Sequence, residues 1–236
     1  MNSIYNDGTY LSHNPSWHAE DASFKAKKIF NLLSRNHIQI ETISEIGCGT
    51  GEILVQLESM LPAVKKLTGY DISKDAIDIA IKKETQKIKF ENKDITQEGE
   101  KLFYDLQLVI DTIEHIENYF QFLKSIGDTS NYTIFHIPLD MCVWSLFREK
   151  MLIESKKRVG HIHNFTEDFI ISILSDYGFE TIDKIYTEPI FKASTIKQKI
   201  IRFSQIILYT INKRLCIKTL GGYSILVLTK NKLYKS

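Results

Sequence analysis

The stretch EIGCGTGE, residues 45–52, carries three glycines at alternate positions between two acids. Glycine destabilises the interior of a strand or helix, so this run indicates either a tight turn or a close approach of the backbone to a ligand. A dinucleotide fingerprint reads GxGxxG and directs a helix N-terminus at a pyrophosphate, which an acid at the helix start would repel. The spacing GxGxG with flanking acids therefore favours a ligand that carries positive charge.

A second acid, Asp71, ends the apolar stretch KKLTGYDI, 20 residues after Gly51. A carboxylate at the end of a second strand can accept two hydrogen bonds from a ribose diol. Both NAD and S-adenosylmethionine contain that diol, so Asp71 alone leaves the two cofactors open.

Four histidines are candidates for acid–base chemistry, because imidazole titrates near neutral pH. His115 follows the apolar stretch 105–111, and His136 lies in NYTIFHIP, where it could instead be an inward-facing, hydrogen-bonded residue. His161 and His163 are two positions apart in GHIH, so an extended loop would point them to opposite sides, and of these two we expect His161 to face the site. His115, His136 and His161 therefore remain the candidate bases. No carboxylate joins these histidines at regular spacing, so we expect no metal site.

Strand-like and helix-like apolar patterns alternate along the chain. This alternation predicts an open, mostly parallel α/β sheet with helices on both faces and ligands at the C-terminal ends of the strands. The expected strands are 41–46, 65–72, 86–92, 105–111, 131–138, 179–188 and 221–230, and the expected helices are 17–35, 51–61, 73–83, 117–126 and 166–178.

ExGxGxG at 45–51, the acid Asp71 and KDI at 93–95 resemble the class I S-adenosylmethionine-dependent methyltransferases, over roughly 41–188 and the final strand. The resemblance implies a Rossmann-like sheet of about seven strands, mostly parallel with an antiparallel last strand. It also implies S-adenosylmethionine as cofactor and S-adenosylhomocysteine as product, with Asp71 on the ribose hydroxyls and Glu45 orienting the loop or the amino group. The cofactor-binding residues that it implies are Glu45, Gly47, Cys48, Gly49, Gly51, Asp71, Ile72, Asp94, Ile95 and Asp111.

A narrower likeness, carried by 10–29, 109–123, 134–140 and 160–169, is to bacterial methyltransferases of small molecules or surface-glycan precursors. It implies that residues 1–40 form a helical lid over a methyltransferase domain at 41–236. Tyr10, Trp17 and His18 would close over the methionine end of the cofactor. The alternative is a core tryptophan and a histidine that caps a helix.

Residues 139–163 interrupt the alternation and are interpreted as an insertion that walls the acceptor pocket. Within and beside it, Trp144, Arg148 and His163 are the predicted substrate-binding residues. The run KKR at 156–158 suits a phosphate or a nucleotide-linked sugar, although a solvated helix face is the alternative.

The net charge of +1 conceals an asymmetry, because all 29 acidic residues lie at or before Glu188 and ten lysines and arginines follow it. The basic insertion near 189–218 includes an amphipathic segment, 195–218, that could contact an anionic membrane or pack within the protein. The polar N-terminus, the short apolar runs and three widely spaced cysteines lead us to expect a cytoplasmic protein without a signal peptide.

The sequence therefore predicts an O-methyltransferase that acts on a small anionic metabolite, such as a capsule or surface-polysaccharide precursor in a bacterium, for example in O-methyl phosphoramidate formation. The alternatives are a membrane-surface lipid or quinone methyltransferase, a NAD-dependent oxidoreductase and a non-catalytic cofactor-binding protein. The stretch DTIEH stands where DNA amino-methyltransferases carry [DN]PP[YF], which disfavours an exocyclic base amine as acceptor. No nucleic-acid partner is expected, with an RNA acceptor as the minor alternative. The sequence leaves the oligomeric state open.

Overall fold

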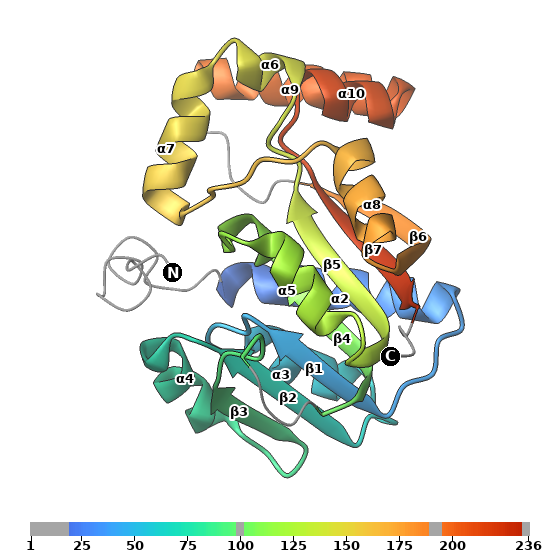
Figure 1. Cartoon of the computed structure of the whole chain (residues 1–236). Helices are drawn as coiled ribbons and strands as arrows, with labels where there is room; N and C mark the ends of the chain where they lie inside the picture. The colour runs from blue at the N-terminus through green and yellow to red at the C-terminus, as the bar shows by residue number, and fades with distance from the viewer. Residues whose placement is uncertain (1–18, 98–101, 189–194, 233–236) are drawn as a thin grey trace.

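The computed structural model describes residues 19–97, 102–188 and 195–232, which form one seven-stranded sheet of order β3-β2-β1-β4-β5-β7-β6 (Figure 1). Strands β1 to β5 pair in parallel, and β7 runs antiparallel to both of its neighbours, β5 and β6. The predicted fold class is confirmed. The strands are β1 (Thr42–Ile46), β2 (Lys66–Asp71), β3 (Ile88–Asn92), β4 (Tyr104–Ile110), β5 (Ser130–Pro138), β6 (Phe179–Thr187) and β7 (Ser224–Asn231).

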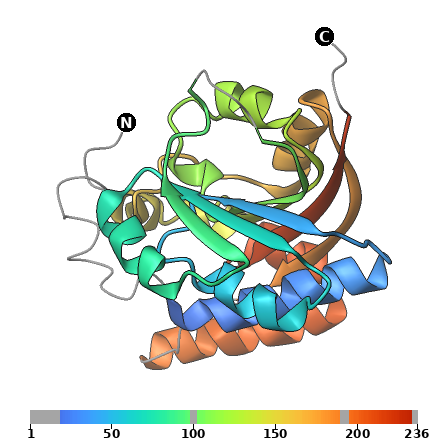
Figure 2. The ribbon, with the colours of Figure 1, turned by 90° about the horizontal axis from the view of Figure 1, so that it is seen from below.

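Helices cover both faces of this sheet, as the views in Figures 1 and 2 show. The longer helices are α2 (Ala19–Arg35), α3 (Glu52–Met60), α4 (Lys74–Ala80), α5 (Tyr119–Ile126), α7 (Glu149–Val159), α8 (Glu167–Asp176), α9 (Ile196–Ile211) and α10 (Lys213–Thr219). The short ones are η2 (Ile81–Lys83), η3 (Ile113–His115) and α6 (Val143–Leu146).

Strand β4 divides the interior into two apolar clusters, because successive side chains point to opposite faces. Leu108 belongs to the cluster covered by α2, α3 and α4, whereas Val109 belongs to the cluster covered by α5, α8 and α10. Both side chains are fully buried, as the continuous apolar run of this strand predicts.

Helix α2 is part of the core. Ala26, Ile29 and Leu32 are fully buried against the sheet, and Arg35 pairs with Asp183 of β6. The predicted lid at 1–40 stays a prediction, because Tyr10, Trp17 and His18 lie outside the described residues.

The two insertions form a group of helices beyond the C-terminal end of β5 (Figure 1). Residues 139–163 fold into α6 and α7, and the basic segment divides into α9 and α10 at Asn212. Asn212 has extended backbone angles and its side chain accepts a hydrogen bond from the Leu215 amide, which starts the second helix. No helix in the described ranges is long and apolar enough to cross a bilayer.

Candidate active site

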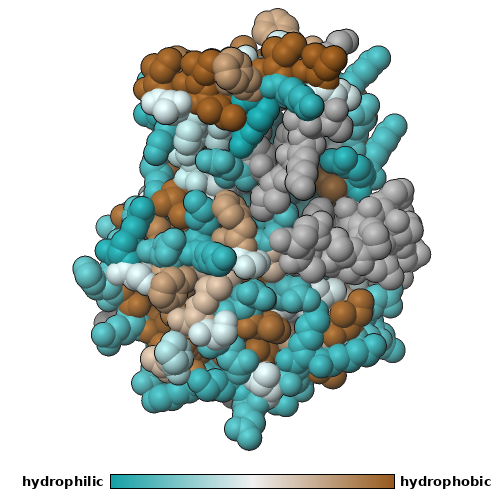
Figure 3. All heavy atoms as spheres, turned by 180° about the vertical axis from the view of Figure 1, so that it is seen from behind, coloured by the Kyte–Doolittle hydropathy of each residue, from teal (hydrophilic) through white to brown (hydrophobic). Residues whose placement is uncertain are grey.

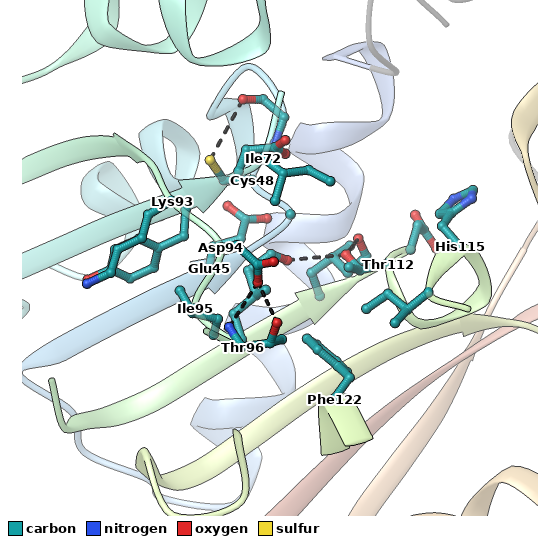
Figure 4. Close-up of a pocket in the computed structure, with 18 of the residues that line it drawn as sticks. Glu45, Cys48, Ile72, Lys93, Asp94, Ile95, Thr96, Thr112, His115 and Phe122 are labelled. Carbon is teal, nitrogen blue, oxygen red and sulfur yellow. Dashed lines mark hydrogen bonds between the residues drawn. The ribbon is translucent and has the colours of Figure 1, made fainter. Parts of the chain in front are cut away.

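A cavity of about 470 Å³ opens at the C-terminal ends of β1, β2 and β4 (Figure 4). Its walls include the glycine loop, residues 93–96 and the segment that follows β4. Figure 4 shows Thr112 and His115 on one side of the cavity and Lys93 and Ile95 on the other. This is the edge where parallel α/β sheets bind their ligands.

The glycine loop needs glycine for both backbone shape and space. Gly47, Gly49 and Gly51 all have positive φ angles, of 70°, 53° and 80°. A Cβ atom at Gly51 would lie 2.3 Å from Cζ of Phe90, and one at Gly47 would lie 2.6 Å from Oγ1 of Thr112. Phe90 and Thr112 therefore pack directly against the backbone of the loop, and a side chain at Gly51 or Gly47 would displace them.

Glu45, the last acid before the loop, lines the cavity with a side chain that is almost fully buried. Its Oε2 atom has no hydrogen-bond partner among the described residues. Burial raises the pKa of this carboxyl well above its usual range, and Asp71 adds to that rise while Lys25 opposes it. A cationic group in the cavity would satisfy this oxygen, which matches the positive charge expected of the ligand.

Asp71 lies at the end of β2 and fixes the glycine loop. Its Oδ2 accepts a hydrogen bond from the Gly49 amide at 2.8 Å, and its Oδ1 accepts one from the Ser73 amide at 2.8 Å. Burial raises the pKa of Asp71, and the Ser73 and Gly49 amides oppose the rise. Each carboxylate oxygen can accept a further hydrogen bond, so Asp71 keeps the capacity to hold a ribose diol.

Four further predicted cofactor residues, Cys48, Ile72, Asp94 and Ile95, line the same cavity. Asp94 accepts hydrogen bonds from the amide and hydroxyl of Thr96, at 2.9 and 2.6 Å, and so shapes the turn after β3 (Figure 4). Ile72 and Ile95 add apolar surface to the cavity wall. Cys48 is buried under the loop, where burial raises the pKa of its thiol well above its usual range.

Asp111 directly follows β4 and has a φ of 47°, a left-handed conformation that is uncommon outside glycine. Its carboxylate lies 2.6 Å from Nζ of Lys25 on α2 and 2.5 Å from Nδ1 of His136 on β5. Burial would raise the pKa of Asp111, but His136 and Lys25 together hold it well below its usual range. Three elements thus fix one ionised carboxylate at the cavity wall.

The structure places the four histidines differently. His136 is 4% exposed, and its Nε2 lies 2.7 Å from Oγ1 of Thr187, so both of its ring nitrogens face protein groups. His115 alone of the four lines the cavity. His161 lies beside His115, with ring centroids 5.1 Å apart, and His163 contacts the Ile116 carbonyl at 2.9 Å.

The predicted substrate residues on the insertion lie farther out. The guanidinium of Arg148 lies 5.8 Å above the ring of Trp144, and neither residue lines the cavity. The acid at the start of α3, Glu52, pairs with Lys83, which weakens the repulsion of a pyrophosphate that the sequence suggested.

Lys25 and Glu114 are among the residues at the site that the sequence reasoning missed. Lys25 lines the cavity from α2, and no pattern around it distinguishes it from other helix lysines. Glu114 is fully buried directly before His115, and the dipeptide EH was the one available signal for it.

A family profile described as "Methyltransferase domain" matches residues 18–184. The chain belongs to this methyltransferase family. No curated protein matches the chain significantly. The match decides between the two cofactors that a ribose diol leaves open, because the family uses S-adenosylmethionine.

Solved structures of methyltransferases share the fold over most of the chain. The N-methyltransferase NodS of Bradyrhizobium japonicum, in complex with S-adenosylhomocysteine, aligns with a TM-score of 0.60 and 16% identity, covering 95% of this chain and 99% of that one. The plantazolicin methyltransferase BpumL, in complex with a monoazolic desmethylPZN analog and S-adenosylhomocysteine, aligns with a TM-score of 0.61 and 19% identity, covering 98% of this chain and 93% of that one. The magnesium protoporphyrin IX methyltransferase ChlM of Synechocystis PCC 6803, with bound S-adenosylhomocysteine, aligns with a TM-score of 0.60 and 15% identity, covering 89% of this chain and 83% of that one.

The cavity of this methyltransferase fits S-adenosylmethionine. The backbone of Gly47 and Gly49 lines the cavity without side chains, and the unpartnered Oε2 of Glu45 suits the cationic part of that cofactor. When bound, the cofactor supplies a methyl group on a positively charged sulfur, which is an excellent leaving group.

Proposed function

We propose that the protein transfers the methyl group of S-adenosylmethionine to an oxygen of a small anionic metabolite, such as a precursor of a bacterial surface polysaccharide. The new bond joins the acceptor oxygen to the methyl carbon, the carbon–sulfur bond breaks, and its electron pair stays on sulfur. The acceptor hydroxyl also loses a proton, which needs a group placed at the cavity.

His115 is the residue that the geometry supports for contact with the acceptor. Its Nδ1 lies 3.0 Å from the Gly160 carbonyl, which can only accept, so Nδ1 carries the ring proton. The neutral ring then holds its lone pair at Nε2, the tautomer that can take a proton from a hydroxyl. His115 is also the one predicted base that lines the cavity, and this single observation carries the proposal.

The anionic character of the acceptor is supported by the basic last turn of α7. Lys156, Lys157 and Arg158 all lie there, close in sequence to Gly160 and its contact with His115. An anion drawn to these side chains would approach the cavity from the side of the insertion. Because NodS is an N-methyltransferase, a nitrogen acceptor is the runner-up.

The proposal is tested by release of S-adenosylhomocysteine in the presence of phosphorylated and nucleotide-linked sugars. We expect turnover with at least one anionic hydroxyl compound, and we expect His115→Gln to lower kcat by about 100-fold, the lower end of general acid–base effects. The variant should keep its affinity for S-adenosylhomocysteine. Turnover of amines alone, or full activity of His115→Gln, would contradict the proposal.

A second candidate, a methyltransferase of lipids or quinones at a membrane surface, is favoured by the outer face of α9. Five apolar side chains there are between 46% and 78% exposed, and Figure 3 shows apolar atoms concentrated over this part of the molecule. Basic residues flank this stripe, as in helices that lie on anionic membranes. The stripe consists of Ile196, Ile200, Phe203, Ile207 and Ile211.

Flotation with vesicles that contain anionic lipid separates the two candidates. A membrane enzyme should float with these vesicles, and Phe203→Asp should remove at least about half of the bound fraction. Ile81→Asp is the matched control, because Ile81 is 47% exposed in η2, outside the stripe. A protein that stays unbound at low ionic strength contradicts the membrane candidate.

A further inference from the structure

Glu114, His115 and His161 bring one carboxylate and two imidazoles together at the edge of the cavity. The Nε2 atoms of both histidines lie 4.0 Å from Oε1 of Glu114, and one ligand atom from each residue falls within 4.8 Å of the others. The three come from two segments that are 45 residues or more apart, η3 and the loop after α7. Two imidazoles and a carboxylate are a ligand set for divalent first-row transition metals.

The unpartnered carboxylate of Glu114 indicates that this cluster holds a ligand. Its side chain is fully buried, and neither carboxylate oxygen has a hydrogen-bond partner among the described residues. Folding leaves such a group buried only at a considerable free-energy cost unless a positive charge or a proton compensates it. Asp111 and Asp140 place further negative charge near Glu114. Lys25 places positive charge near Glu114, but its ammonium group already pairs with Asp111.

The outer hydrogen bonds of the cluster are those that metal-binding histidines make. Nδ1 of His115 faces the Gly160 carbonyl at 3.0 Å, and Nδ1 of His161 faces Oδ2 of Asp140 at 2.7 Å. Both partners accept, so Nδ1 of each ring donates, and Nε2 of each, 4.0 Å from Oε1 of Glu114, is the nitrogen that can ligate a cation. A carbonyl or carboxylate behind a metal-bound histidine fixes its tautomer and raises its basicity.

The backbone holds the two segments together independently of any ligand. The amides of Ile162 and His163 both donate to the Glu114 carbonyl, at 3.0 and 3.1 Å. A tetrahedral cation with ligands at about 2.1 Å keeps neighbouring ligand atoms about 3.4 Å apart, so binding requires the three ligand atoms to approach one another by about 0.6–1.4 Å. Side-chain rotation within a fixed backbone frame can provide that movement.

We propose that Glu114, His115 and His161 bind a divalent transition-metal cation whose remaining coordination positions face the cofactor cavity. His115 lines that cavity, so an acceptor oxygen could occupy one of those positions. A bound cation lowers the pKa of a coordinated hydroxyl, and His115 then acts as a ligand in place of a proton acceptor. This catalytic part rests on the proposed O-methyl transfer, whereas the cation site itself does not.

The test uses the full chain freed of metal with EDTA and titrated with Co²⁺, followed by calorimetry and by visible absorption of the bound cation. We expect one equivalent to bind, and we expect Glu114→Gln and His161→Gln each to weaken binding by at least about tenfold. Gln replaces Glu114 with a neutral group of the same shape, and thermal unfolding in EDTA confirms that each variant is folded.

His163→Gln is the matched control, because His163 lies on the same loop but its ring faces the Ile116 carbonyl. Its affinity for Co²⁺ should equal that of the wild type. The proposal is overturned if the wild type binds no stoichiometric Co²⁺, or if Glu114→Gln and His161→Gln bind it as tightly as His163→Gln does.

The outcome is separable from that of the proposed function. Binding of S-adenosylhomocysteine in EDTA and turnover of anionic acceptors report on methyl transfer, whereas Co²⁺ titration reports on the cluster alone. Cobalt binding without any turnover supports the cation site and contradicts the proposed function. Metal-independent turnover in a chain that binds no Co²⁺ supports the proposed function and contradicts the cation site.

Discussion

Replacing Gly51 with alanine tests how the glycine loop packs where it enters α3. Gly51 has a φ of 80°, and an added Cβ would meet Cζ and Cε1 of Phe90 at 2.3 and 2.4 Å. Phe90 is 5% exposed within the apolar cluster under α3 and α4, so its ring has little room to move. The substitution therefore adds backbone strain and overpacking at one position.

The two effects have separate magnitudes. A left-handed conformation costs a residue with a Cβ about 1–2 kcal/mol. An extra methyl group in a packed core costs about 1–3 kcal/mol. We therefore expect Gly51→Ala to lower the free energy of unfolding by about 2–5 kcal/mol.

Equilibrium unfolding in urea measures this loss, and Gly127→Ala is the matched control. Gly127 has a φ of −66° and a ψ of −20°, and its added Cβ would come no closer than 3.4 Å to another atom. Because alanine adopts that backbone conformation without strain, the control should change stability by less than about 1 kcal/mol.

A second substitution separates the strain from the overpacking. Phe90→Leu creates space beside Gly51, so it should be less destabilising in the Gly51→Ala background than in the wild type, by about 1 kcal/mol or more. The reasoning is refuted if Gly51→Ala costs no more than Gly127→Ala. It is also refuted if the two substitutions at Gly51 and Phe90 are additive.

Three further predictions concern charged groups. Asp71→Asn should weaken S-adenosylhomocysteine binding by about tenfold or more in calorimetry, since charged acceptors make the stronger hydrogen bonds, while the exposed Asp75→Asn should not. Lys25→Met should lower the free energy of unfolding by about 1–3 kcal/mol in urea, because it removes one partner of the partly buried Asp111 carboxylate, and an unchanged stability contradicts this. Asp105 accepts hydrogen bonds from the Glu41 and Thr42 amides, which hold its pKa below the usual value against the effect of burial. Its contribution is therefore complete above the unfolded pKa near 4 and is lost as the pH falls through the lower folded pKa. Asp105→Asn should cost about 1–2 kcal/mol at pH 7, with a difference from wild type that shrinks below pH 4; a constant difference would contradict the assignment.

Local patterns were sufficient for the framework of the protein. The alternation of strands and helices predicted the seven-stranded sheet, because burial on two faces imposes its period on the sequence. The glycine loop and Asp71 were predictable for the same reason, since a strand, its turn and the next helix start are contiguous in the chain.

The division of the basic segment into two helices is a feature that local patterns did not predict. Apolar residues recur at helical spacing throughout 195–218, yet the chain turns at Asn212, and only α10 contributes buried apolar side chains, Cys216 and Ile217, to the cluster. Helix α9 packs Leu208 and Tyr209 against the same cluster and leaves its other apolar face exposed, because docking, and not the apolar spacing, decides which face is covered.

By itself the sequence determined the fold class and one half of the site, the bare loop at 45–51 and the acid Asp71 that fixes it. Only the tertiary structure decided that Lys25 from α2 meets Asp111, that His136 is enclosed, and that Glu114 and His161 lie together. The physical reason is separation along the chain. Contacts between residues tens of positions apart depend on how helices dock on the sheet, and this docking leaves no periodic trace in either segment.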